Sequence, residues 1–189
     1  MIEYPWFDEV GDDAGIEQGD IIVDCNAILA YEEHYDNIMN DIENDLPLDI
    51  ITFNGIVLSQ SCDIINDKIT NVIVCPVITL KELCENDDYY KASAARESLR
   101  QGREPAHHLL HRVSLCQDKS SEFYVVSFRH VYSIPKRYVK ALIKNKVRKR
   151  LLPPYREHLS QSFARYFMRV GLPTNISKDE IKNYDRIEF

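Results

Sequence analysis

The sequence contains no apolar run long enough to cross a membrane, and residues 1–13 have neither the basic region nor the apolar core of a secretion signal. These absences predict a cytoplasmic protein with no membrane among its partners. The five cysteines are odd in number and lack the paired spacing of a metal site or a disulfide framework. We therefore expect reduced thiols, no metal and no cofactor, with Cys25 and Cys75 buried in apolar strands.

Positive charge is almost missing from the first half of the chain. Residues 1–90 contain 21 acidic residues and two lysines, whereas residues 91–189 contain 21 Lys and Arg and nine acidic residues. A chain polarised in this way has an acidic region and a basic region that face either each other or separate partners.

The positive charge is densest in residues 136–150, where eight of fifteen residues are cations. One interpretation is a surface that binds the phosphates of a nucleic acid. The alternatives are a helix with a solvated basic face or a site for an acidic protein partner. The candidate nucleic-acid-binding residues are Lys136, Arg137, Lys140, Lys144, Lys146, Arg148, Lys149 and Arg150.

Three segments rich in Val and Ile predict consecutive β-strands at residues 19–25, 55–63 and 71–77. Residues 106–115 alternate as a strand and are predicted to pair with residues 123–131 across a polar turn. The length is that of one domain that can bury its own core.

The remaining segments predict an acidic N-terminal arm and three helices around the barrel of residues 19–135. The arm covers residues 1–18, an acidic helical insert covers residues 31–49, and a second helix covers residues 88–101. Residues 136–189 then comprise the basic segment and an aromatic helix that starts after Pro153 and Pro154, ends at Gly171 and packs on the barrel.

These strands resemble the MazF/PemK family of SH3-like barrels, many of which are ribonuclease toxins. The resemblance lies in the Gly19-Asp20 opening, the polar loop after the second strand, Pro76 in the third, and a late strand at residues 123–135 that turns into a helix. It implies an α+β fold built on a small antiparallel SH3-like β-barrel, with inserted helices and a C-terminal helix. It also implies a groove for single-stranded RNA, a homodimer, and an acidic insert that either covers the basic surface or is merely peripheral.

The family's catalytic pattern is only partly present. Family members have an Arg-Pro pair before the second strand, where this chain has Asn54-Gly55 or Phe53-Asn54 and no cation. They also have a Pro-x-Thr triplet at the third strand, which Thr79 matches after one extra residue. A substitute cation is Arg129 or Lys81, because phosphoryl transfer needs a charge at the phosphate. The candidate catalytic residues are therefore Thr79, Ser59, Arg129 and His130, with His130 as general acid or base.

A polar cluster after the second strand is the candidate ligand-binding loop, because an apolar strand fixes what the following loop presents. Turn capping explains the same residue types. Cys62 needs a neighbouring His or Arg to become a nucleophile. His107 and His111 on one strand face suggest a weaker metal hypothesis, with Cys62 and Asp63 as distant ligands. The cluster consists of Ser59, Gln60, Ser61, Cys62 and Asp63.

Two functions follow. The missing Arg favours a barrel that has lost catalysis and recognises nucleic acid or protein in a toxin-like or phage-defence assembly. The alternative is a metal-independent endoribonuclease that cleaves single-stranded RNA, and an enzyme built on Cys62 is a third hypothesis.

Overall fold

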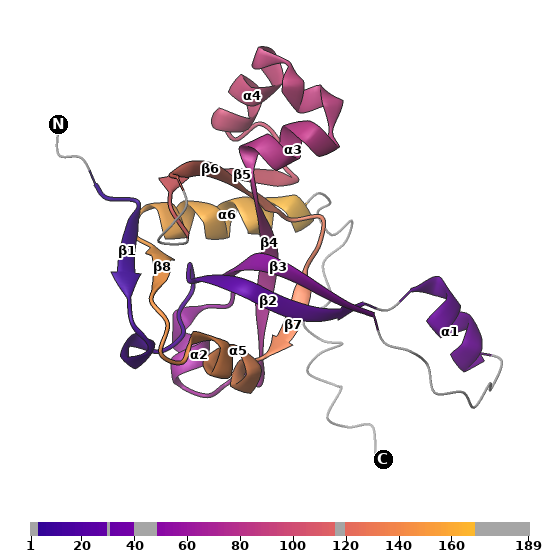
Figure 1. Cartoon of the computed structure of the whole chain (residues 1–189), viewed down its shortest axis with the longest axis vertical. Coiled ribbons are helices and arrows are strands. Elements are labelled where there is room, and N and C mark those ends of the chain that lie inside the picture. Colours follow the sequence, from indigo (N-terminus) through magenta and orange to yellow (C-terminus); the bar gives the residue numbers. More distant parts are fainter. Residues whose placement is uncertain (1–3, 30, 40–48, 116–119, 169–189) are drawn as a thin grey trace, which may run out of the picture.

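The structure is a computed structural model that describes residues 4–29, 31–39, 49–115 and 120–168 (Figure 1). It is a mixed α+β fold in which two antiparallel sheets are surrounded by helices. The strands are β1 (Phe7–Val10), β2 (Ile21–Leu29), β3 (Asp49–Val57), β4 (Asn71–Thr79), β5 (His107–Val113), β6 (Glu122–Ser127), β7 (Tyr132–Pro135) and β8 (Arg148–Leu151). The helices are η1 (Asp12–Ala14), α1 (Glu32–Met39), α2 (Ser61–Ile65), α3 (Leu80–Asn86), η2 (Asp88–Lys91), α4 (Ser93–Arg100), α5 (Lys136–Ile143) and α6 (Tyr155–Phe167).

The larger sheet has six strands and is not closed into a barrel. Its strand order is β2-β3-β4-β6-β5, and β7 pairs with β4 at the end that β6 leaves free. The expected antiparallel α+β architecture is therefore present, while the closed SH3-like barrel is not. Strands β1 and β8 form the second sheet, which joins the start of the chain to the segment before α6.

The predicted strand pairing is correct for β5 and β6, which pair from His107 with Ser127 onward, and β4 covers the predicted third strand. The second strand, predicted at residues 55–63, begins and ends earlier in the chain than predicted. β3 begins at Asp49 and ends at Val57, because the polar residues after Leu58 turn the chain into the short helix α2.

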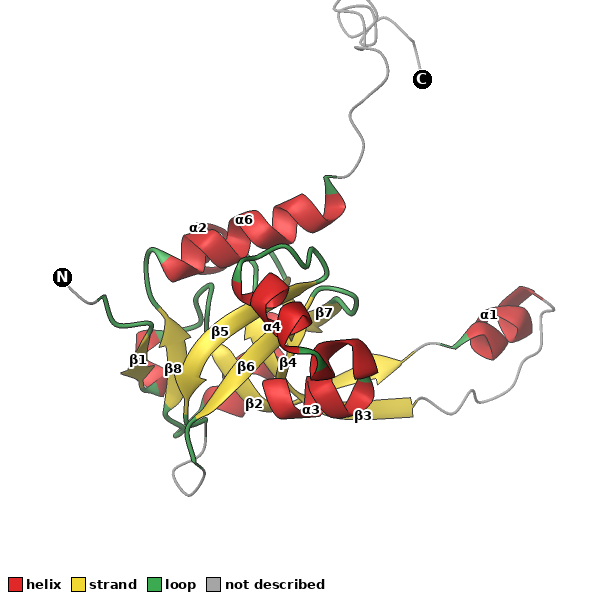
Figure 2. Cartoon of the chain, turned by 90° about the horizontal axis from the view of Figure 1, so that it is seen from above, coloured by secondary structure: helices red, strands yellow, loops and turns green. Residues whose placement is uncertain are grey.

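Both faces of the central strands are buried, so their apolar residues do not alternate with polar ones. Ile21 and Leu110 belong to a core covered by α6, whose Leu159 is fully buried in it. Ile22 and Val72 belong to a second core, which Val139 of α5 completes. Figure 2 shows α6 lying across the sheet, so the aromatic stripe of the last helix packs within the chain.

The predicted helices are present with changed limits. The helix expected at residues 88–101 is divided into η2 and α4, because Ala92 between them has an extended backbone. α6 starts after Pro154 as predicted, and Phe167 is its last helical residue, while Gly171 lies outside the described residues. No helix in the described ranges is long and apolar enough to cross a membrane.

Strands β2 and β3 continue beyond the sheet as a two-stranded arm. β3 pairs with β4 only from Gly55 to Val57, whereas its pairing with β2 extends to Asp49 opposite Leu29. Figures 1 and 2 show α1 at the far end of this arm, apart from the other described elements. The acidic helix therefore does not cover the basic segment of its own chain, and residues 40–48 of the predicted insert lie outside the described residues.

Candidate nucleic-acid interface

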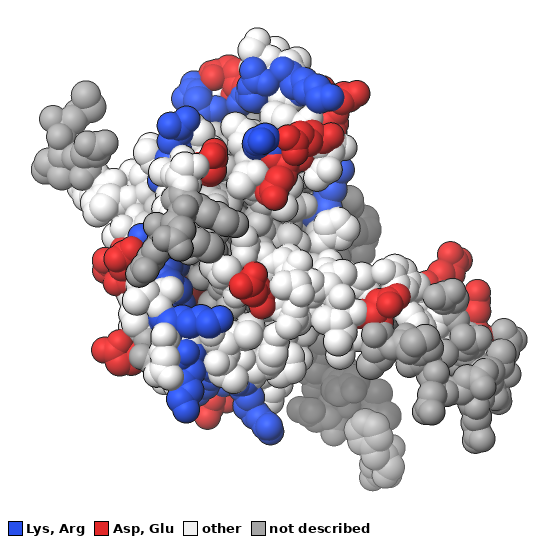
Figure 3. Space-filling model, in the orientation of Figure 1, with Lys and Arg blue, Asp and Glu red and all other residues white. Residues whose placement is uncertain are grey.

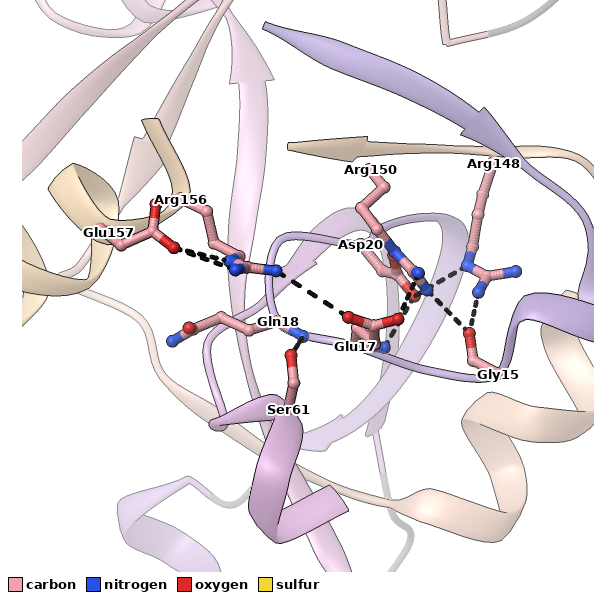
Figure 4. A network of polar contacts seen from close by, with 9 residues as sticks. All are labelled: Gly15, Glu17, Gln18, Asp20, Ser61, Arg148, Arg150, Arg156 and Glu157. Carbon is pink, nitrogen blue, oxygen red and sulfur yellow. Dashed lines mark hydrogen bonds and ion pairs between the residues drawn. The ribbon is translucent and has the colours of Figure 1, made fainter. Parts of the chain in front are cut away.

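Two residues of the basic segment, Arg148 and Arg150, are buried and form a network around Asp20, which has no exposed surface (Figure 4). The Arg148 Nε atom lies 2.8 Å from Asp20 Oδ2, and the Arg150 Nε atom lies 2.5 Å from Oδ1. Both guanidinium groups also donate to the Gly15 carbonyl. Buried charges are tolerated where they are paired and hydrogen-bonded, as they are here.

The network extends to α6 through Glu17. Arg150 Nη1 lies 2.5 Å from Glu17 Oε1, and Arg156 Nη1 lies 3.8 Å from Glu17 Oε2. The N-terminal arm, β8 and α6 are thus joined by alternating charges (Figure 4). The polarised halves of the sequence face each other at this point, which was one of the two predicted arrangements.

Four of the eight candidate nucleic-acid-binding cations therefore have partners within the chain. Arg148 and Arg150 are buried in the Asp20 network, and this corrects their expected role as free phosphate ligands. Lys136 is also buried and pairs with Asp67, and that hydrogen bond and charge lower the pKa of the Asp67 carboxyl. Lys149 pairs with Glu9 but is partly exposed.

The other four, Arg137, Lys140, Lys144 and Lys146, are exposed on α5 and on the segment that follows it. In Figure 3, Lys and Arg side chains gather on the visible face around β8 and α5. These cations remain accessible to a phosphate backbone, whereas Arg148 and Arg150 of β8 anchor the N-terminal arm.

An aromatic stack stands beside this basic region. The indole of Trp6 lies parallel to the ring of Tyr155, with 3.7 Å between centroids and 11° between planes. The exposed ring of His111 lies 5.6 Å from the indole at 28°. These side chains line a depression of about 570 Å³, together with Arg112 and Lys149.

A second depression of about 580 Å³ lies next to the first. Its lining includes Lys146, Ser114 and Glu9, which pairs with Lys149, and it shares Lys149 with the first depression. The two depressions thus meet at Lys149, and the second extends to Asn145 and Lys146, in the segment after α5. We call this surface the basic-aromatic face, consisting of Trp6, His111, Arg112, Lys146, Lys149 and Tyr155.

Sequence reasoning missed most of this face. Trp6 lies in the acidic N-terminal arm, Arg112 lies in the strand predicted at residues 106–115, and Tyr155 lies in the aromatic helix predicted to pack on the barrel. The backbone explains their meeting: β1 pairs with β8, and the Leu152 amide donates to the Trp6 carbonyl at 2.8 Å. The sequence signal is Trp6 itself, the one tryptophan of the chain, which stands with Tyr4 and Phe7 among the acidic residues of the N-terminal arm.

The predicted ligand-binding loop lines a smaller polar depression of about 370 Å³ with α6. Gln60, Ser61 and Cys62 contribute to it, as do Arg156 and Ser160. Several polar groups there are already engaged: Ser61 Oγ accepts the Gln18 amide at 3.1 Å, as Figure 4 shows.

The two ends of the loop have structural partners. Ser59 Oγ accepts the Ile73 amide at 2.8 Å, and Asp63 lies 3.4 Å from Lys68. The loop thus connects β3, α2 and β4, and ligand binding by this loop stays a prediction.

The four candidate catalytic residues are not brought together. Ser59 lies beside Ile73, and Thr79 lies six residues further along β4, a distance of about 20 Å at the rise of a strand. Thr79 forms a capping box, in which its hydroxyl donates to Glu82 Oε2 at 2.9 Å and accepts the Glu82 amide at 3.0 Å.

Arg129 and His130 are exposed in the turn after β6. Arg129 acts electrostatically on His107, whose pKa is lowered by burial and then by this charge. The turn that carries Arg129 and His130 connects β6 to β7, and both of these strands pair with β4.

The histidines of β5 do not form a metal centre in the described part of the chain, where no three metal-ligating side chains meet. His107 is buried, with Nδ1 2.8 Å from the Tyr90 hydroxyl, while His111 is exposed beside Trp6. Cys62 is exposed next to Asp63, and these two lie on α2 rather than on β5.

The other described cysteines fit the prediction of unpaired thiols. Cys25, Cys75 and Cys84 are free, and Cys116 lies outside the described residues. Burial raises the pKa of Cys25 to about 11 and that of Cys75 to about 12, so both remain protonated at neutral pH.

Comparison of the chain with models of protein families, with curated proteins and with solved structures finds no match. The functional assignment therefore depends on the arrangement of the residues described above.

Proposed function

We propose that the protein is a recognition module that binds single-stranded nucleic acid, with RNA as the expected ligand, on the basic-aromatic face and without cleaving it. The observation that supports this most is the Trp6–Tyr155 stack beside Arg112 and Lys149 in one depression. Proteins that bind single strands combine these two elements, since cations follow the phosphates and aromatic rings stack on bases.

The two depressions suit an extended strand better than a compact ligand, because they lie side by side and share Lys149. A base stacked on the aromatic wall would place its neighbouring phosphates toward Arg112 and Lys146. Stacking contributes about 1–3 kcal/mol per base and is tolerant of sequence. We therefore expect weak base preference and strong dependence on salt.

The endoribonuclease alternative has less support. A phosphoryl-transfer site needs a positioned nucleophile and a cation at the same phosphate. Ser59 contacts β4 at Ile73, six residues before Thr79, and the hydroxyl of Thr79 is engaged in a helix cap. A role in a toxin-like or phage-defence assembly stays a prediction from the family resemblance.

The test is the salt dependence of binding to a fluorescein-labelled, unstructured single-stranded RNA, measured by fluorescence anisotropy. For single strands the slope of log K against log salt is about 0.7 per phosphate contact. The double variant Arg112→Gln/Lys146→Gln should bind more weakly and should have a slope smaller by about 1.4.

A matched control is Lys81→Gln/Arg100→Gln. It removes the same charge from exposed positions on α3 and α4, away from the basic-aromatic face. If the two double variants lose equal affinity, binding reflects net charge alone and the proposed face is wrong. Absence of binding by the native chain at low salt also contradicts the proposal.

A further inference from the structure

An apolar groove runs between the β2–β3 arm and β7. Its volume is about 620 Å³, with the arm on one side and β7 with Tyr138 of α5 on the other. Figure 1 places β7 and α5 beside the part of the arm that leaves the sheet. Small-molecule sites are clefts of about 300–1,000 Å³ with mainly apolar and aromatic walls, so the groove has the size and the lining of such a site.

The groove has a packed floor and exposed apolar walls. Ala27 and Ile134 line it and belong to the buried core that α5 completes. Along the walls, Ile28 is 62% exposed, Ile50 is 66% exposed and Val131 is 40% exposed. Contiguous exposed apolar side chains mark binding sites, because a molecule that covers them removes their surface from water.

Charge indicates what kind of molecule the groove accepts. All the residues that line it are uncharged, although the helices on either side of it carry charge. Arg137 and Lys140 are exposed on α5, and Glu32 and Asp36 are exposed on α1. A charged ligand would lose its hydration in the groove without meeting a counter-ion there. The groove therefore favours a neutral ligand, in contrast to the basic-aromatic face.

One polar group of the lining lacks a partner. The Tyr138 hydroxyl is one of two buried side-chain atoms in the described part of the chain that have no hydrogen-bond partner. Two other polar side chains of the groove are engaged: Ser133 Oγ accepts from Asn71 Nδ2 at 3.0 Å, and Asn26 Oδ1 accepts from the Thr52 hydroxyl at 2.6 Å. Because Tyr138 as a whole is only half-buried, a shift of its ring toward the groove would bring the hydroxyl to a ligand. An unpaired buried hydroxyl is unfavourable, and a ligand oxygen that accepts its hydrogen bond removes that cost.

We propose that the groove binds a neutral, mainly hydrocarbon small molecule with one carbonyl oxygen, which accepts a hydrogen bond from the Tyr138 hydroxyl. The hydrocarbon part of the ligand covers Ile28, Ile50 and Val131. The groove shares no lining residue with the two depressions of the basic-aromatic face. This second site is therefore independent of the proposed binding of nucleic acid.

The first measurement uses prodan, a neutral naphthalene ketone whose emission shifts to shorter wavelength in apolar surroundings. Titration of prodan with the full native chain should give a saturable shift. Val131→Glu places a charge in the groove and should weaken prodan binding at least about tenfold. Ile65→Glu is the matched control and should bind prodan as the native chain does, since Ile65 is 67% exposed on α2, outside the groove.

The second measurement tests the hydrogen bond to Tyr138 with two competitors of similar shape that displace prodan. Acetylnaphthalene has a carbonyl oxygen, and isopropylnaphthalene has a methyl group in its place. Tyr138→Phe removes the hydroxyl and retains the ring. The affinity for the ketone relative to the hydrocarbon should be about fivefold higher in the native chain than in Tyr138→Phe, which is the net effect of one hydrogen bond.

Three results would overturn the proposal: no saturable shift of prodan with the native chain, equal loss of binding in Val131→Glu and Ile65→Glu, or the same ratio of affinities in Tyr138→Phe. Saturating single-stranded RNA should leave prodan bound, and displacement by RNA would place the probe on the basic-aromatic face instead. Tyr35→Lys in α1 should bind prodan as the native chain does. Tighter binding in that variant would identify α1 as the occupant of the groove and would also overturn the proposal.

Discussion

Replacing Asp20 by Asn tests whether the buried charge network holds the N-terminal arm to β8. Asp20 is fully buried and accepts hydrogen bonds from Arg148 Nε at 2.8 Å, from Arg150 Nε at 2.5 Å and Nη2 at 3.0 Å, and from the Glu17 amide at 3.0 Å. The asparagine amide retains the shape of the carboxylate but removes its negative charge, so the buried guanidinium groups of Arg148 and Arg150 lose this counter-ion. Breaking a buried pair in this way costs about 3–5 kcal/mol.

This loss is large against the stability of an ordinary domain, which is about 5–15 kcal/mol. Urea unfolding followed by Trp6 fluorescence measures it, because Trp6 belongs to the arm that the network anchors. With a slope of about 2 kcal/mol per molar urea, a loss of 4 kcal/mol lowers the midpoint by about 2 M.

The control is Asp88→Asn, which removes an equally short pair with Lys91 at 2.5 Å from a carboxylate that is 87% exposed. Exposed pairs contribute about 0–1 kcal/mol, so this midpoint should hardly move. If Asp20→Asn costs no more than Asp88→Asn, the network does not stabilise the fold and the reasoning is wrong.

Three further predictions concern single positions. Gly19 has a φ of +88°, and a Cβ there would meet the Leu151 carbonyl at 3.0 Å, so Gly19→Ala should cost at least about 1–2 kcal/mol in urea unfolding; an unchanged midpoint would contradict this. Burial lowers the pKa of His108 to about 4, with a smaller contribution from His158. Between pH 6.5 and pH 4 the unfolded chain therefore binds a proton at His108 that the folded chain does not bind. The free energy of unfolding should fall by about 3 kcal/mol over this range, and His108→Leu should remove this part of the pH dependence of stability. Thr79→Ala should cost about 0.5–2 kcal/mol of stability through its lost cap and leave RNA binding unchanged, with no cleavage in EDTA by either protein; RNA cleavage that Thr79→Ala abolishes would restore the nuclease hypothesis.

Local patterns predicted the elements better than their assembly. The alternation around Leu110 and Val125 was enough to identify the β5–β6 hairpin, and the spacing of Leu159 and Phe163 identified the last helix. The arm could not be foreseen, because the segment before Phe53 has no strict alternation and its pairing with β2 is determined by tertiary register.

The charge pattern likewise predicted which charges are present but not where the fold places them. The sequence indicated that an acidic and a basic half would meet or bind separate partners, but composition does not distinguish buried cations from exposed ones. Arg148 and Lys146 are two residues apart, yet the first lies in the Asp20 network and the second lines an open depression. Only the pairing of β8 with β1 separates their roles.

The central claim is that single-stranded nucleic acid stacks at the basic-aromatic face, and the intrinsic fluorescence of Trp6 tests it most directly because the chain has one tryptophan. Titration of the full chain with unlabelled single-stranded RNA should quench this fluorescence in a saturable manner. The quenching should weaken as salt increases and should be reduced in Arg112→Gln/Lys146→Gln. RNA that binds without changing Trp6 fluorescence, or that does not bind at all, would contradict the account.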